Sequence, residues 1–189
     1  MLNAIAAVTL RILLFRAGPQ DFPHLPQLVG PMPAAGAAAY SLFWSMLLPP
    51  GEAILIALSG VGALAFVTHS LLSARGLANR FQQTYHALLA ATAVLALLLV
   101  PPALAMAPVI REIAANPDLL KTPEQVQMPA VPAAMVNLIE LWAFAVYTNV
   151  FRQAMDAWLL VGVLIALFVA FSTTLLTVVM TALLLPLVR

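Results

Sequence analysis

The sequence predicts an all-α, polytopic transmembrane helical bundle of about five spans, preceded by an N-terminal interfacial helix. Of its 189 residues, 63% are hydrophobic and only 8% are charged, and the mean hydropathy is +1.03. Soluble domains carry roughly a quarter charged residues, so this composition could not be hydrated as a soluble globule. Several apolar runs reach the roughly 20 residues that a helix needs to cross a bilayer. The alternating short strands of an outer-membrane barrel are absent from the sequence.

Residues 1–32 are expected to form an interfacial helix and a proline-rich arm. The segment 2–16 is too short to span, and its positive charges, Arg11 and Arg16, come after its first apolar residues rather than before them as in a signal peptide. The segment AGPQDFPHLPQLVGPMP is punctuated by prolines and cannot be a regular helix. We therefore expect 2–16 to lie on the bilayer, with its arginines available to anionic headgroups.

Residues 33–189 are expected to form the transmembrane domain. Pro101 and Pro102 should kink or end the third span. The long connection at 108–131 contains the turn signals NPD and TPEQ, which favour a place outside the membrane. The five spans are predicted at about 33–49, 52–74, 82–107, 132–153 and 157–188.

The positive charges predict the orientation of the bundle. The connections that would face one side carry Arg11, Arg16, Arg75, Arg80 and Arg152, whereas the opposite connections carry mainly acidic or mixed charges. Cytoplasmic connections are enriched in Lys and Arg. The N-terminus is therefore expected in the cytoplasm and, after five spans, the C-terminus on the external side.

Small residues in the last span predict a close helix contact. Gly162, Ala166 and Ala170 follow one another at intervals of four, which lets a second helix backbone approach closely. The row Thr173, Thr177 and Thr181 lies beside them and can bond back to carbonyls or across to a neighbour. The contact could be internal packing, which is the commoner use of such motifs, or a docking face for another subunit.

Glu140 is the one charged residue placed deep inside a predicted span. It lies twelve residues before Arg152, roughly 18 Å along a helix, near the middle of a hydrocarbon core about 30 Å thick. Asn137 and Tyr147 share its helical face. We expect a protonated Glu140 that faces the bundle or a partner and belongs to this intramembrane polar stripe. A structural role is favoured over proton relay or cation binding.

Two histidines could hold a cofactor. His69 lies six residues before Arg75, and His86 lies six residues after Arg80. A hairpin would therefore place both imidazoles at similar depth, where they could bind a haem or a metal. The favoured alternative is that each is a polar cap near the interface, because the sequence offers no third ligand nearby. We expect no resident cofactor or metal.

No motif predicts catalysis. The chain has no cysteine, no Gly-rich phosphate loop, no HExxH and no nucleophile elbow. With a net charge of +1 and no basic cluster, nucleic acid is not an expected partner.

Three stretches carry a resemblance: RAGPQDFPHLPQL (16–28), GLANRFQQTYHALLAA (76–91) and NVFRQAMD (149–156). They resemble a family of small proteobacterial inner-membrane proteins, loosely grouped with the Yip-type five-span proteins. The resemblance implies a bacterial inner-membrane location, in which the external side expected for the C-terminus would be the periplasm, but it implies no active-site residues. The Asp-Leu-Tyr-Gly-Pro signature of eukaryotic Yip proteins is missing, since 28–31 reads LVGP, so their trafficking role is not implied.

Three functions remain open from the sequence. The first is a non-catalytic accessory or assembly subunit of a larger membrane complex, with the bilayer and other integral subunits as partners. The second is a small transporter or proton-coupled protein that uses Glu140. The third is a haem- or pigment-binding protein that uses His69 and His86.

Overall fold

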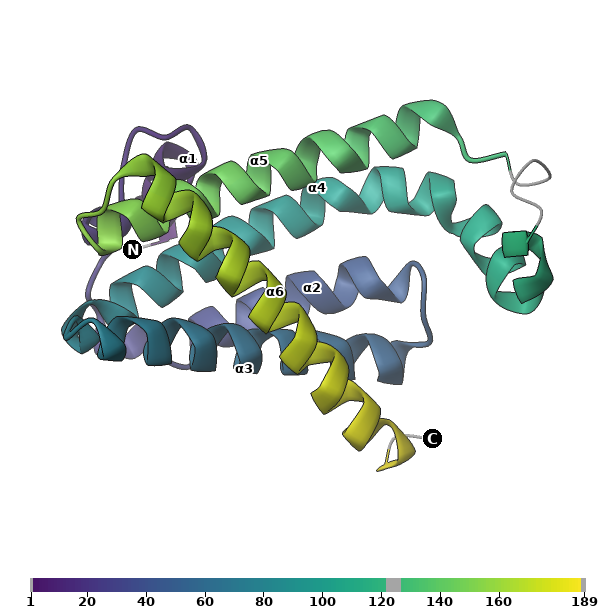
Figure 1. Cartoon of the computed structure of the whole chain (residues 1–189), viewed down its shortest axis with the longest axis horizontal. Coiled ribbons are helices and arrows are strands. Elements are labelled where there is room, and N and C mark those ends of the chain that lie inside the picture. The colour runs from purple at the N-terminus through teal and green to yellow at the C-terminus, as the bar shows by residue number, and fades with distance from the viewer. Residues whose placement is uncertain (1, 122–126, 188–189) are drawn as a thin grey trace.

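The computed structural model describes residues 2–121 and 127–187, and within these residues the chain is helical with no strand. This confirms the predicted all-α class. Figure 1 shows one bundle of helices that run back and forth, with the short N-terminal helix across one end. The α-helices are α1 (Leu2–Leu13), α2 (Pro31–Ser45), α3 (Pro50–Ala74), α4 (Phe81–Ala115), α5 (Ala130–Ala154) and α6 (Leu159–Leu184). The 3-10 turns are η1 (Pro19–Asp21), η2 (Pro26–Leu28), η3 (Ala78–Arg80), η4 (Pro117–Lys121) and η6 (Leu185–Leu187).

Four helices of the described chain, α3 to α6, are long and apolar enough to cross a membrane. The predicted first span forms α2, but its 15 residues extend only about 22 Å, less than a hydrocarbon core about 30 Å thick. The predicted count of five spans is therefore not confirmed. The shorter α2 pairs with α3 as a hairpin and packs on α4.

The end of α4 differs from the prediction. The helix does not stop near 107 but continues to Ala115, through Pro101, Pro102 and Pro108. Prolines are tolerated in membrane helices where neighbouring elements support the backbone, and here α2 and α5 both pack along α4. Much of the predicted 108–131 connection is therefore helical, and residues 122–126 lie outside the described part.

The most tightly packed core lies at the end of the bundle that carries α1. The predicted 2–16 helix is present as α1, and it packs on α4 and α5. Trp142 Nε1 of α5 donates a hydrogen bond of 2.9 Å to Leu13 O at the end of α1. The proline-rich arm follows, and its Phe22 is 1% exposed. The largest fully buried side chains gather mainly from these elements: Phe22, Phe151, Ile12, Leu13, Leu72, Leu88 and Leu89.

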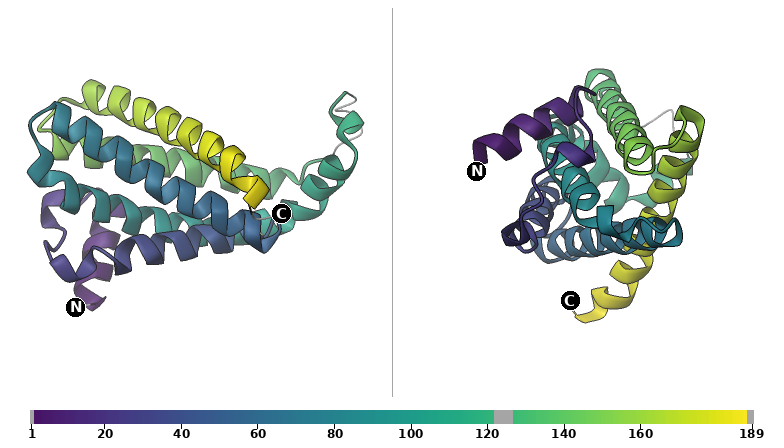
Figure 2. Two further views of the ribbon diagram at one scale, coloured as in Figure 1. Left: turned by 90° about the horizontal axis from the view of Figure 1, so that it is seen from below. Right: turned by 90° about the vertical axis from the view of Figure 1, so that its left-hand side faces the viewer.

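The last helix crosses the others obliquely. It starts against the end of α5 and finishes along α3 (Figure 1), so α5 and α6 diverge. The start of α1 and the end of α6 lie at opposite ends of the bundle (Figure 2). This divergence leaves space beside α6 in the half of the bundle away from α1.

Candidate functional site

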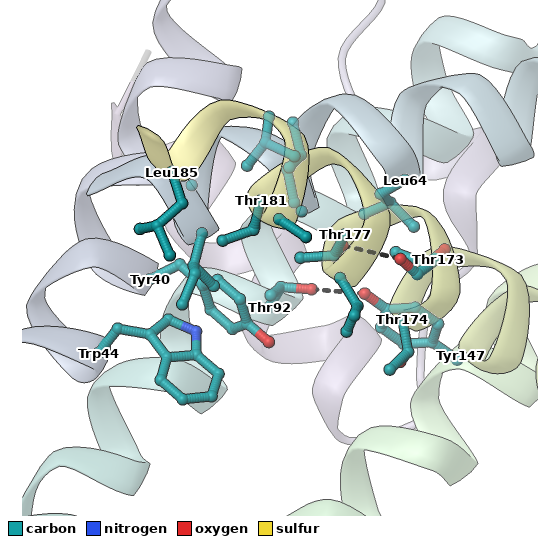
Figure 3. Close-up of a pocket in the computed structure, with 17 residues that line it drawn as sticks. Tyr40, Trp44, Leu64, Thr92, Tyr147, Thr173, Thr174, Thr177, Thr181 and Leu185 are labelled. Carbon is teal, nitrogen blue, oxygen red and sulfur yellow. Dashed lines mark hydrogen bonds between the residues drawn. The ribbon is translucent and has the colours of Figure 1, made fainter. Parts of the chain in front are cut away.

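A cavity of about 520 Å³ lies between α6 and the helices beneath it. We call it the inner cavity. Tyr40 and Trp44 enter it from α2, and a row of threonines enters from α6 (Figure 3). Its volume lies within the range of about 300–1,000 Å³ typical of small-molecule sites. The lining residues are Gly36, Tyr40, Trp44, Ile56, Gly60, Val61, Leu64, Leu89, Thr92, Tyr147, Thr173, Thr174, Thr177, Val178, Thr181, Ala182 and Leu185.

Some polar groups of the inner cavity are paired and others are not. The Thr92 and Tyr147 hydroxyls share a hydrogen bond of 2.8 Å, and Thr177 Oγ1 donates to Thr173 O over 2.7 Å (Figure 3). By contrast, three buried atoms have no hydrogen-bond partner among the described residues. They are Trp44 Nε1, Thr173 Oγ1 and Thr181 Oγ1.

A second space of about 300 Å³ opens between α5 and α6, over α4. We call it the α5–α6 cleft. It shares part of its wall with the inner cavity: Tyr40, Thr92, Tyr147, Thr173 and Thr174. The remaining lining residues are Leu95, Ala96, Leu99, Glu140, Ala143, Phe144, Ala166 and Ala170.

Glu140 lies on the wall of this cleft and is exposed. It forms no hydrogen bond or ion pair with any residue of the described chain. Tyr147, two helical turns further on, lines the same cleft, whereas Asn137 is exposed and lines neither space. The structure therefore brings two members of the predicted polar stripe together and leaves the third outside.

The small residues of α6 mark where this helix touches α5 and where the two helices separate. A Cβ added at Gly162 would lie 2.9 Å from Arg152 Cβ and 3.0 Å from Thr148 O of α5. Ala166, one turn later, is 0% exposed, but Ala170 is exposed and lines the cleft. The two helices thus touch at Gly162 and separate beyond Ala166, so the small-residue row is used inside the chain at its start and is open at its end.

The two histidines have different surroundings. His69 is exposed and packs edge-on against Phe81, with ring centroids 5.1 Å apart. His86 is 2% exposed and packs against Phe22 and Tyr85. Neither lines the cavity or the cleft, and the described residues hold no group of three His, Asp or Glu side chains suited to a metal.

The three stretches that carry the family resemblance meet at the α1 end of the bundle. Arg80 Nη1 donates to Ala154 O over 2.7 Å and pairs with Asp156 Oδ2 at 2.8 Å. Gln20 Nε2 donates to Gln153 Oε1, and Gln83 Nε2 donates to Phe22 O. These bonds tie the arm to α4 and α5 inside one chain. A pocket of about 450 Å³ lies among them, and its polar side chains are largely bonded to one another.

Sequence reasoning did not single out Tyr40, Trp44 or Thr92. The signal for Thr92 was present, because it is the only polar residue between 87 and 100. Tyr40 and Trp44 are one helical turn apart in α2, but the sequence does not show which bundle face they share. In comparisons with known proteins, no family model, curated protein or solved structure matches this chain, so the resemblance stays a prediction.

Proposed function

We propose that this chain is a non-catalytic integral protein of the bacterial inner membrane that acts as an accessory or assembly subunit of a larger complex. The observation that carries the proposal is the position of Glu140. This carboxyl group lies on an open cleft wall and has no partner within the described chain.

An unpaired acid in the membrane is costly. An acidic side chain at the centre of a membrane helix costs about 2.5–3.5 kcal/mol on insertion scales, and such residues nearly always face a bundle interior or a polar partner. Glu140 is the eleventh of 25 residues in α5, well away from either end of the helix. A donor from a neighbouring subunit's transmembrane helix, placed in the α5–α6 cleft, would remove this cost.

The shape of the cleft supports the same partner. Because α5 and α6 separate beyond Ala166, the cleft is flanked by two long apolar helices whose outward residues, such as Leu138 and Phe171, are about 70% exposed. A partner helix could instead enter the α5–α6 cleft between these faces and direct one polar side chain to Glu140, while the outward faces stay in contact with lipid. The arm needs no such partner for its order, since α4 and α5 of the same chain hold it.

The arrangement of arginines supports the proposed orientation. Arg75 and Arg80 in the α3–α4 connection and Arg152 near the end of α5 all belong to the α1 end of the bundle. We propose that this end faces the cytoplasm and that the opposite end, with the C-terminus, faces the periplasm.

A second candidate function rests on the neighbours of Glu140. The cleft also presents the hydroxyls of Tyr40, Tyr147 and Thr92, two of which are hydrogen-bonded. An acid beside linked hydroxyls could relay protons in a small transporter.

The experiment compares Glu140→Gln with Glu140→Leu. Each tagged variant is extracted from native membranes in mild detergent, and the size of the complex is measured on a native gel. We expect Gln to preserve the larger species, because an amide still donates and accepts, and Leu to lose it. Leu138→Ala, on the outward face of the same helix, is the control and should preserve it.

Each other outcome decides against the proposal. A chain that migrates as a monomer in all variants, or a complex that survives Glu140→Leu, contradicts the subunit function. A Gln variant that forms the complex normally but has lost proton-coupled uptake in reconstituted vesicles decides for the transporter.

A further inference from the structure

We propose that the inner cavity is a binding site for an uncharged, membrane-soluble molecule that carries a carbonyl oxygen on an apolar body. The inference goes beyond the subunit function and does not use Glu140, which lines only the α5–α6 cleft, although the two spaces share part of a wall. It rests on the unpaired donors of the inner cavity, its lack of charge and its opening toward lipid.

The unpaired donors define what the ligand must offer. Trp44 Nε1 is buried beside the Tyr40 ring, with ring centroids 6.2 Å apart. Apart from an electrostatic contact with the Tyr40 hydroxyl, it has no hydrogen-bond partner among the described residues. An indole N–H can only donate, so the missing partner must be an acceptor. From the opposite helix, Thr173 and Thr181 add two buried hydroxyls that have no hydrogen-bond partner in the described part of the chain. Buried polar groups in proteins nearly always find a partner, and a ligand oxygen would supply one.

The rest of the wall determines the body of the ligand. No charged residue of the described chain lines the inner cavity, so nothing would stabilise a ligand charge there. Aliphatic side chains from three helices, including Ile56, Leu64 and Leu89, form much of the wall. An apolar body with one or two carbonyl oxygens matches this arrangement. A quinone ring and the acyl ester of a lipid both have this chemistry.

The entrance of the inner cavity faces the lipid side. Thr174, Val178 and Ala182 line the cavity and are also exposed on α6. The opening therefore runs along α6, which crosses the bundle obliquely (Figures 1 and 3). A molecule dissolved in the bilayer would reach the cavity without passing through water.

Gly60 is a position at which a substitution could fill the inner cavity. An added Cβ at Gly60 would lie 3.6 Å from Tyr40 Cε1 and 3.7 Å from Thr177 Oγ1, which are ordinary contact distances. A larger side chain at this position would enter the cavity without a clash at its Cβ. Gly60→Leu should therefore fill the space while the helices keep their places.

The test is a fluorescence titration of the purified chain in lipid nanodiscs, without any partner subunit. All proteins carry Trp158→Phe, which removes an indole that is 82% exposed. The fluorescence of Trp44 is obtained by subtracting the spectrum of the same protein with Trp44→Phe in addition. Three quenchers are compared: a decyl-substituted benzoquinone, a brominated dodecanoate methyl ester, and bromododecane, which has no carbonyl.

We expect saturable quenching of Trp44 by the quinone or the ester, and only non-saturable quenching by bromododecane. Comparing the affinity for the quinone with the affinity for the ester shows which of the two ligand classes the cavity prefers. Thr173→Val and Thr181→Val should each weaken binding about fivefold, the usual effect of one hydrogen bond. Thr68→Val changes a buried threonine outside the cavity and should leave binding unchanged. Gly60→Leu should abolish saturation.

Three results would overturn the inference. The first is the absence of saturation with both carbonyl probes. The second is bromododecane binding as tightly as the ester. The third is equal binding by the Thr173→Val, Thr181→Val and Thr68→Val proteins. None of these three results depends on Glu140 or on complex formation. The binding-site inference can therefore be wrong while the subunit proposal is right, and the reverse.

Discussion

The hydroxyl oxygens of Thr92 and Tyr147 lie 2.8 Å apart, and their hydrogen bond joins α4 to α5 in the wall shared by the inner cavity and the α5–α6 cleft. This bond therefore fixes the two helices beside both candidate sites.

The first prediction concerns this bond. Tyr147→Phe and Thr92→Val should each lower the free energy of unfolding by about 1 kcal/mol, because each leaves a hydroxyl or its site unpaired. The double variant should cost less than the sum, with a coupling of about 0.5–1.5 kcal/mol. The free energy of unfolding of the wild type, the two single variants and the double variant is measured by reversible unfolding in mixed micelles. Strict additivity would show that the hydroxyls do not interact.

The second prediction compares two glycines. Gly162→Ala should destabilise the protein by about 1–3 kcal/mol, because the new Cβ meets Arg152 Cβ and Thr148 O at 2.9 and 3.0 Å. Gly62→Ala is the matched control in α3, since a Cβ there meets nothing within 4 Å. It should be neutral or stabilising, because alanine favours helix more than glycine does. Thermal unfolding in one detergent ranks the pair, and an equal loss from both would contradict the α5–α6 contact.

The third prediction separates two bonds of Arg80. Arg80→Met removes both bonds of Nη1, the one to Ala154 O at the end of α5 and the ion pair with Asp156, and should cost about 1–2 kcal/mol. Asp156→Asn removes only the ion pair, whose side chains are 38% and 75% exposed, and should cost about 0–1 kcal/mol. Asparagine also tolerates the φ of 49° found at Asp156. If the Asn variant loses as much stability as the Met variant, the ion pair and not the carbonyl bond is the important contact.

The fourth prediction tests the proposed orientation. The chain has no cysteine, so single cysteines can be placed at Ser73 near the end of α3 and at Asn116 after α4, both of which are exposed. A membrane-impermeant maleimide added to spheroplasts should label Asn116→Cys and not Ser73→Cys. Labelling of Ser73→Cys alone would invert the orientation, and equal labelling would contradict a bundle that spans the bilayer.

Much of the fold could be predicted from the sequence, because long apolar runs and proline-rich breaks act locally. The helices corresponding to 52–74, 132–153 and 157–188 are present near their expected bounds as α3, α5 and α6. One error concerns tertiary support: Pro101 and Pro102 do not end α4, because neighbouring helices hold its backbone in place. The predicted span at 33–49 is not confirmed, since α2 has only 15 residues.

The candidate sites were only partly predictable. Glu140 and Tyr147 could be paired from helical periodicity, and the α6 threonines from their spacing. The contribution of Tyr40 and Trp44 depends on how α2 packs against the α6 row, which no local pattern contains. The separation of α5 and α6 likewise follows from the crossing of α6, and it leaves Ala170 open although Gly162 and Ala166 are buried.

The most direct test of the subunit function is photo-crosslinking from the α5–α6 cleft in native membranes. A benzophenone amino acid is placed at Ala170, on the cleft wall, or at Phe168, which is 55% exposed and lines neither space. The proposal predicts one protein adduct from position 170 that persists with Glu140→Gln and disappears with Glu140→Leu, and none from position 168. Adducts from both positions alike, lipid adducts alone, or an adduct from position 170 that survives Glu140→Leu would contradict it.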